Sequence, residues 1–222
     1  MNEHNRKIID YMKSIYTHDL FNVFSDFVEL SALSISNAVE WNEEREERYL
    51  NIAKSYKKQE IVLFPKMFLE LTLGLEESMT DVLGNLFMEL GLGNELQGQF
   101  FTPMSVCRLC AEITLEDKKE EIIKNGFISL NEPAAGAGAM IISFAEAMKN
   151  KGLNYQRLLS VTAVDTDIRA VHMCYVQLSL LGIQAIVYHG NTLSMKTFSK
   201  FYTPMKKLLE KNKSPFIFRL LA

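Results

Sequence analysis

The fold is decided by the stretch Asn131-Glu132-Pro133-Ala134-Ala135-Gly136-Ala137-Gly138-Ala139-Met140. It follows an apolar run at residues 127–130, which predicts a buried strand, and it precedes residues 140–148, which predict a helix. A turn of small residues between a strand and a helix lets the backbone approach a ligand closely. Such a turn also aims the free N–H groups of the helix start at that ligand. We therefore expect an α/β fold with a ligand site at this turn.

The residues around the glycines indicate which ligand fits. A dinucleotide-binding turn would read Gly-x-Gly-x-x-Gly, but here Gly136 and Gly138 are followed by Ile141 at the third position. The pair Glu132-Pro133 precedes the glycines instead. A carboxylate at a strand end attracts a cationic group and repels a pyrophosphate. The amino and sulfonium groups of S-adenosylmethionine are cationic, so this cofactor fits the acidic residue.

A second strand, predicted at residues 160–165, also ends in an acid, Asp165. A carboxylate at that place can accept two hydrogen bonds from a ribose diol. Residues 168–181 predict a helix capped by Asp167, and residues 185–188 predict a third strand. Strands that alternate with helices in this way predict a Rossmann-like sheet.

Three stretches resemble one family of enzymes, and they occur in the family's order. Residues 132–138, Glu-Pro-Ala-Ala-Gly-Ala-Gly, resemble the S-adenosylmethionine-binding motif of N6-adenine DNA methyltransferases, Asp-Pro-x-Cys-Gly-x-Gly. Residues 98–103, Gly-Gln-Phe-Phe-Thr-Pro, are similar to a signature of the modification subunits of type I restriction-modification systems. Residues 81–84 resemble the stretch that leads into that signature. The resemblance covers roughly residues 81–193.

The resemblance implies a set of cofactor-binding residues. Phe100, Phe101 and Thr102 would line the methionine end of the pocket. Asn191 stands where the family has an acid that reaches the adenine amino group, and its side-chain carbonyl can still accept a hydrogen bond. Thr102 has a second explanation, because it can cap a helix that begins at Pro103. The implied set is Phe101, Thr102, Glu132, Pro133, Ala134, Gly136, Gly138, Asp165 and Asn191.

The catalytic motif of the family is absent from this sequence. Such enzymes carry an Asn/Asp/Ser-Pro-Pro-Tyr/Phe tetrad at the end of the fourth strand, where it holds the flipped target base. The chain has five prolines, and no two are adjacent. Ser214-Pro215-Phe216 is one proline short, and residues 216–218 are expected to form the fourth strand itself. We therefore assign no catalytic residue and no metal ligand, and we expect the sheet to be incomplete.

Residues 1–95 are expected to form an α-helical domain, and residues 96–222 a partial Rossmann-like methyltransferase domain. Pro65 is expected to break or bend the helical segment around it. The helical domain either caps the second domain or offers a surface to a partner subunit, and an exposed sheet edge favours self-association or a partner. Helices are predicted at 5–16, at 20–40 with Asp19 as cap, from 43 to about 58, at 78–90 and at 104–115.

The composition limits the cellular setting. The formal net charge of −3 argues against nucleic-acid binding over the whole surface. Residues 196–222 carry seven Lys or Arg against Glu210 alone, so this tail is either a phosphate-binding segment or, as we favour, a solvated one. No apolar run approaches membrane-spanning length, and three cysteines are too few for a disulfide framework, which favours the cytoplasm. Cys107 and Cys110 are interpreted as core residues of one helix.

The sequence therefore indicates a protein that binds S-adenosylmethionine, with DNA as the substrate class and a type I restriction-modification subunit as the expected partner. It is expected to be inactive alone because the tetrad is missing. Activity through an unrecognised group and a truncated product of a longer gene are alternatives. A further alternative is a helical partner-binding module with a relic cofactor site.

Overall fold

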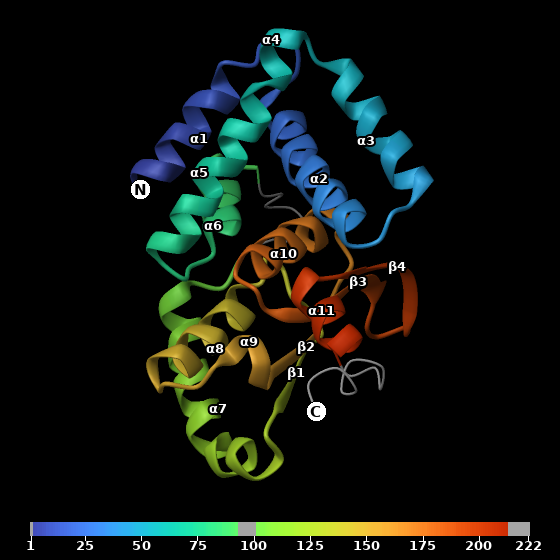
Figure 1. Ribbon diagram of the computed structural model, residues 1–222. Helices are drawn as coiled ribbons and strands as arrows, with labels where there is room; N and C mark the ends of the chain where they lie inside the picture. Colours follow the sequence, from blue (N-terminus) through green and yellow to red (C-terminus); the bar gives the residue numbers. More distant parts are fainter. Residues whose placement is uncertain (1, 93–100, 213–222) are drawn as a thin grey trace.

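The structure, a computed structural model, describes residues 2–92 and 101–212. The first segment consists of helices and their connections (Figure 1). Asp19 caps α2 by accepting a hydrogen bond from the Asn22 N–H at 2.9 Å, which confirms the predicted cap. The helices are α1 (Glu3–Lys13), α2 (Leu20–Val39), α3 (Glu43–Ser55), α4 (Lys58–Ile61), α5 (Leu63–Glu77) and α6 (Val82–Glu89).

Two features of this helical segment differ from the sequence prediction. Pro65 does not break a helix, because it lies in the first turn of α5, where its missing N–H would have no partner in the helix. α6 begins at Val82, later than the predicted start at residue 78. Its cap is Asp81, which accepts a hydrogen bond from the Gly84 N–H at 2.7 Å.

The second segment alternates helices and strands. Asp167 caps α10 by accepting a hydrogen bond from the Arg169 N–H at 2.9 Å, as the sequence predicts. The elements are α7 (Met104–Asn125), β1 (Ile128–Glu132), α8 (Ala139–Asn150), α9 (Tyr155–Leu158), β2 (Leu159–Asp165), α10 (Ile168–Leu180), β3 (Gln184–Asn191), β4 (Lys196–Tyr202) and α11 (Pro204–Asn212).

The described strands form one sheet in the order β1-β2-β3-β4. β1, β2 and β3 are parallel, with Leu130 opposite Val161 and Val161 opposite Ala185. α8 connects β1 to β2, and α10 connects β2 to β3. This arrangement is one half of a doubly wound sheet, in which ligands bind at the carboxyl ends of the strands. The structure thus confirms an α/β fold with a helical N-terminal region.

β4 corrects the interpretation of the basic tail. It pairs antiparallel with β3, with Tyr202 opposite Ile186 and Lys196 opposite Asn191. Residues 196–202 therefore belong to the sheet and are not merely a solvated tail. Most of β4 is exposed on both sides, so its sequence lacks the alternation that predicts a strand. The fourth strand predicted at residues 216–218 lies outside the described residues.

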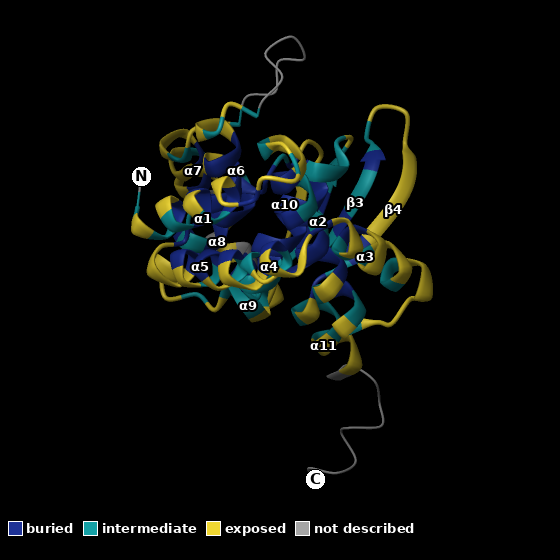
Figure 2. Cartoon of the chain, turned by 90° about the horizontal axis from the view of Figure 1, so that it is seen from above, coloured by how far each residue is buried: buried dark blue, intermediate teal, exposed yellow. Residues whose placement is uncertain are grey.

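A single apolar core runs from the helical segment into the sheet segment. α2 packs along α10, and Figure 2 shows the buried residues gathered in the centre of the molecule. The Phe24 and Phe87 rings lie 5.5 Å apart, and the buried Tyr175 donates its hydroxyl to the Tyr202 carbonyl at 3.2 Å. The helical region therefore packs on the sheet through α10. The domain boundary predicted at residue 95 lies outside the described residues and stays a prediction.

Candidate functional site

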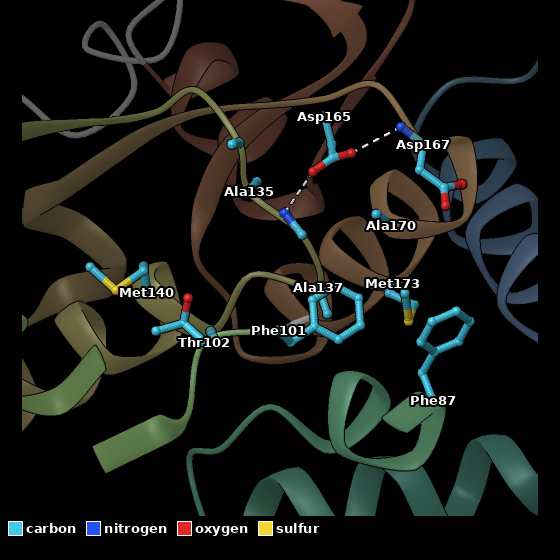
Figure 3. A pocket seen from close by; sticks show the side chains of 13 residues that line it. Phe87, Phe101, Thr102, Ala135, Ala137, Met140, Asp165, Asp167, Ala170 and Met173 are labelled. Atoms are coloured by element: carbon cyan, nitrogen blue, oxygen red, sulfur yellow. Dashed lines mark hydrogen bonds between the residues drawn. The ribbon is translucent and has the colours of Figure 1, made fainter. Parts of the chain in front are cut away.

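A cavity of about 200 Å³ lies at the carboxyl ends of β1 and β2, beside the glycine turn (Figure 3). It is bounded by α6, by the segment before α7, by the turn after β1, and by the start of α10. The side chains and backbone that line it belong to Phe87, Phe101, Thr102, Ala134, Ala135, Gly136, Ala137, Ala139, Met140, Asp165, Asp167, Ala170 and Met173.

The two glycines of the turn have different roles. Gly136 has a φ of +54°, and a Cβ there would lie 3.0 Å from two ring atoms of Phe101. The absence of a side chain thus lets Phe101 lie directly on the turn. Gly138 has a φ of +101° and precedes α8, where a Cβ would lie 3.3 Å from Cys174 Sγ of α10. Gly138 therefore permits close packing behind the cavity and does not line it.

Asp165, at the end of β2, connects this strand to the glycine turn that follows β1. Its Oδ2 accepts a hydrogen bond from the Gly136 N–H at 2.8 Å, and its Oδ1 accepts one from the Asp167 N–H at 2.9 Å (Figure 3). The carboxylate is therefore held in a fixed orientation at the cavity wall. Because each carboxylate oxygen has a second lone pair, Asp165 can still accept hydrogen bonds from a ligand's hydroxyl groups.

Glu132 lies next to this carboxylate, although it does not line the cavity itself. Its Oε1 accepts a hydrogen bond from the Ala134 N–H at 3.2 Å. Partial burial raises the pKa of Glu132, and the negative charge of Asp165 raises that pKa further. Two neighbouring acids make the site favourable for a cationic or hydroxyl-bearing ligand and unfavourable for a pyrophosphate.

Of the predicted cofactor-binding residues, the cavity brings together Phe101, Thr102, Ala134, Gly136 and Asp165. It does not include Glu132, Pro133, Gly138 or Asn191 in its lining. The Pro133 carbonyl accepts a hydrogen bond from Thr192 Oγ1, and Asn191 Oδ1 accepts one from the Ser194 N–H. Phe100 lies outside the described residues. The ligand-binding role of the whole set stays a prediction.

The prediction that Thr102 caps a helix beginning at Pro103 is wrong. Pro103 itself occupies the cap position of α7, with no side-chain hydrogen bond, because its ψ of 137° places it outside the helix. The Thr102 carbonyl instead accepts a hydrogen bond from Cys107 Sγ at 3.6 Å. Cys107 is buried and Cys110 is half-buried. The described residues contain no group of His, Cys, Asp or Glu side chains suited to hold a metal ion.

The sequence did not identify the apolar wall of the cavity. Phe87 of α6 and Met173 of α10 lie beside Phe101 in Figure 3, and the centroids of the Phe87 and Phe101 rings are 5.7 Å apart. Both residues occupy apolar positions at helical spacing, which looks the same whether a helix faces a core or a cavity. The helical segment thus contributes directly to the site through α6.

A buried polar network connects the glycine turn to the helical segment. Gln177 of α10 donates hydrogen bonds from Nε2 to Asp81 Oδ1 and to the Ala137 carbonyl, both at 2.9 Å. Its Oε1 accepts a hydrogen bond from the Leu83 N–H at 3.1 Å. Burial raises the pKa of Asp81, and a Cβ on Gly84 would overlap its carboxylate. One amide side chain therefore fixes α6, α10 and the turn relative to one another.

Comparison with known proteins gives two findings. Residues 82–212, more than half of the chain, match the model of the N-6 DNA methylase family. A crystal structure from Listeria monocytogenes, provisionally assigned to the class I S-adenosylmethionine-dependent methyltransferases, is similar at 15% identity and a TM-score of 0.49. That similarity covers 87% of this chain and 55% of the Listeria chain, so the present chain spans about half of that protein. A search of the curated proteins found no relative of this sequence.

None of the helices in residues 2–92 and 101–212 combines the length and the hydropathy needed to cross a bilayer.

Proposed function

Because the chain belongs to the N-6 DNA methylase family, we propose that the cavity beside the glycine turn binds S-adenosylmethionine. The observation that carries this proposal is the fixed carboxylate of Asp165. Its free lone pairs suit the two ribose hydroxyls of the cofactor. Gly136 leaves room for close approach of the ligand to the backbone, and Phe101 and Met173 offer an apolar wall.

In this proposal Glu132 attracts the cationic methionine end of the cofactor from the edge of the site, and Asp165 holds the ribose. When bound, S-adenosylmethionine supplies an electrophilic methyl group. The residues of this chain bind and orient the cofactor, and α6 and Phe101 shield it from water. The acids at the turn disfavour nucleotides that carry a pyrophosphate.

We also propose that the chain acts on DNA adenine in the manner of a type I modification subunit, and that it is inactive alone. The support is the order of its motifs together with the lack of adjacent prolines in the sequence. A flipped adenine needs an aromatic stacking group and acceptors for its amino hydrogens. We propose that those groups come from a further polypeptide segment, such as a type I partner subunit.

Two features support association. Among the described strands, β1 pairs with β2 alone, so its other edge is open. α7 carries exposed apolar residues on one face, at positions Val106, Leu109 and Ile113. Sedimentation velocity is expected to show a concentration-dependent complex. The association proposal would fail if the chain remained monomeric both alone and with the type I subunits of its host.

A second candidate function is a helical partner-binding module. It is favoured by an apolar groove of about 410 Å³ between α2, α3 and α5, lined by residues such as Phe27, Tyr49 and Phe68. This module would bind its partner without any need for a working cofactor site. Partner binding with no affinity for S-adenosylmethionine would favour it over the first proposal.

The charge of Glu132 provides a pH test of the cofactor proposal. Because the pKa of Glu132 is raised above its ordinary 4.5, affinity for cationic S-adenosylmethionine is expected to strengthen as pH rises above 4.5. The stability of the free protein is expected to change in the opposite direction, since the folded state retains a proton that the unfolded state loses. Equilibrium dialysis and urea unfolding across pH 4.5–7 measure both quantities.

Glu132→Gln is expected to remove the pH dependence of the affinity and to reduce that of the stability, because the buried Asp81 and the half-buried Asp26 also have raised pKa values. Glu47→Gln, an exposed position on α3, is the matched control and should retain both dependences. If the affinities of the native chain and of Glu132→Gln varied with pH in the same way, Glu132 would have no part in binding the cationic group.

A further inference from the structure

The turn between β3 and β4 is fixed beside the proposed cofactor site. Thr192 Oγ1 donates a hydrogen bond to the Pro133 carbonyl at 2.8 Å, and Asn191 Oδ1 accepts one from the Ser194 N–H at 2.9 Å. Ala134, which follows Pro133, lines the cavity. We call residues 191–202 the hairpin. Its turn, residues 192–195, follows the carboxyl end of β3, and the glycine turn follows the carboxyl end of the parallel β1.

The hairpin presents apolar side chains to solvent. Leu193 is 97% exposed, Met195 is 84% exposed and Phe198 is 64% exposed. Figure 2 shows that this turn projects from the molecule and that β4 is exposed along most of its length. These side chains contribute nothing to the core, so the hydrophobic effect within the fold does not explain them.

Met195 also adopts a backbone conformation that favours glycine. Its φ is +56°, and among the described residues it is the one non-glycine residue with a positive φ. A Cβ in this region strains the backbone, and glycine would relieve the strain. Backbone stability therefore does not account for a methionine here, and its side chain is available for another purpose.

The charge of the hairpin itself is positive, although Glu40 and Glu44 line the groove beside Lys200. The sequence has no Asp or Glu between Asp167 and Glu210. Lys196 and Lys200 flank Phe198. Lys200 Nζ lies 5.4 Å from the centre of the Tyr202 ring. A hydrogen bond with Tyr202 and the nearby charge of Glu40 raise the pKa of Lys200, whereas Glu40 forms its ion pair with Lys207. Phe198 lies against His189 with 4.9 Å between ring centroids, which supports its ring from one side.

We propose that the hairpin is a DNA-contacting element, with Leu193 and Met195 entering between bases beside the cofactor site. Phe198 stacks on an unpaired base, and Lys196 and Lys200 contact the flanking phosphates. Apolar side chains can separate stacked bases. Aromatic rings beside lysines can stack on an unpaired base while the lysines contact its phosphates. This inference rests on the proposed function, because DNA as the ligand follows from that proposal.

The test is fluorescence anisotropy of the full chain with a short labelled duplex that contains one mismatched adenine, over a series of salt concentrations. The double variant Met195→Gly, Leu193→Ser is expected to bind the duplex at least about 10-fold more weakly than the native chain. It should melt at or above the native temperature, because glycine suits position 195. Leu69→Ser, at an exposed position on α5, is the matched control and should bind like the native chain.

The lysines are tested in the same titrations. Lys196→Gln with Lys200→Gln is expected to reduce the slope of log affinity against log salt by about 1.8, or about 0.9 for each phosphate that a lysine no longer neutralises. Lys54→Gln, on α3, should leave the slope unchanged. 2-Aminopurine in place of the mismatched adenine should brighten on binding the native chain and not on binding the Met195→Gly, Leu193→Ser variant, since an unstacked base fluoresces more.

The proposal is overturned if the native chain does not bind the duplex, or if the hairpin variants bind it as the native chain does. It is also overturned if the variants abolish self-association or protein-partner binding while DNA affinity is unchanged, because the hairpin would then be a protein interface. S-adenosylmethionine affinity, measured separately, should be unaffected in the hairpin variants. DNA binding through the hairpin without any cofactor binding would support this inference while the cofactor proposal failed.

Discussion

Replacing Gln177 with leucine is expected to lower the free energy of unfolding by about 3–5 kcal/mol. The substitution introduces an apolar side chain of similar size and removes three hydrogen bonds in one step. The Asp81 carboxyl, the Leu83 N–H and the Ala137 carbonyl would each lose a buried partner. Unsatisfied buried groups of this kind cost about 1–3 kcal/mol each and do not add fully. Urea denaturation followed by circular dichroism measures the change.

The matched control for this prediction is Asp81→Asn. The hydrogen bonds that Gln177 and the Gly84 N–H donate to Asp81 both go to Oδ1, which asparagine retains. Because burial raises the pKa of Asp81, a neutral side chain is a close substitute, and a loss of about 1 kcal/mol or less is expected. If Gln177→Leu were no more destabilising than Asp81→Asn, the network would not fix α6 and the turn.

Replacing Asp165 with alanine is expected to weaken binding of S-adenosylmethionine about 100-fold. The carboxylate would provide charge-assisted hydrogen bonds to the two ribose hydroxyls, and a total of about 3 kcal/mol corresponds to that factor. The substitution also leaves the Gly136 N–H without its acceptor, so the turn would lose part of its fixed orientation. Isothermal titration calorimetry of the native and variant chains measures the affinity.

Two further variants separate binding from folding in this prediction. Asp165→Asn keeps one acceptor oxygen and should give an intermediate loss of affinity, whereas Asp10→Asn, on the exposed side of α1, should give none. All three proteins should unfold within about 1–2 kcal/mol of the native chain. Equal affinity of Asp165→Ala and the native chain would place the ribose elsewhere.

Local sequence patterns predicted the central part of the fold well. The strand, the glycine turn and the helix after it follow from short-range rules, and so do the caps at Asp19 and Asp167. Asp165 could also be identified, because an acid at a strand end next to the glycine turn has few structural explanations. These features depend on residues close together in the sequence.

The features that the sequence missed depend on contacts between distant residues. Residues 196–200 of β4 are exposed, and the strand is held by its pairing with β3 and by the buried Phe201, so no alternating pattern within residues 196–202 predicts it. Phe87 and Met173 become site residues only because α6 packs against α10. Gln177 did give a signal, since it is a polar residue within an otherwise apolar helix face, and a fully buried amide requires partners.

The most direct test of the central claim is a calorimetric titration of the native chain with S-adenosylmethionine, with NADH titrated under the same conditions for comparison. The account predicts saturable binding of S-adenosylmethionine with a Kd on the order of micromolar, about −8 kcal/mol, and no binding of NADH. No detectable binding of S-adenosylmethionine, or tighter binding of the pyrophosphate-containing nucleotide, would contradict it.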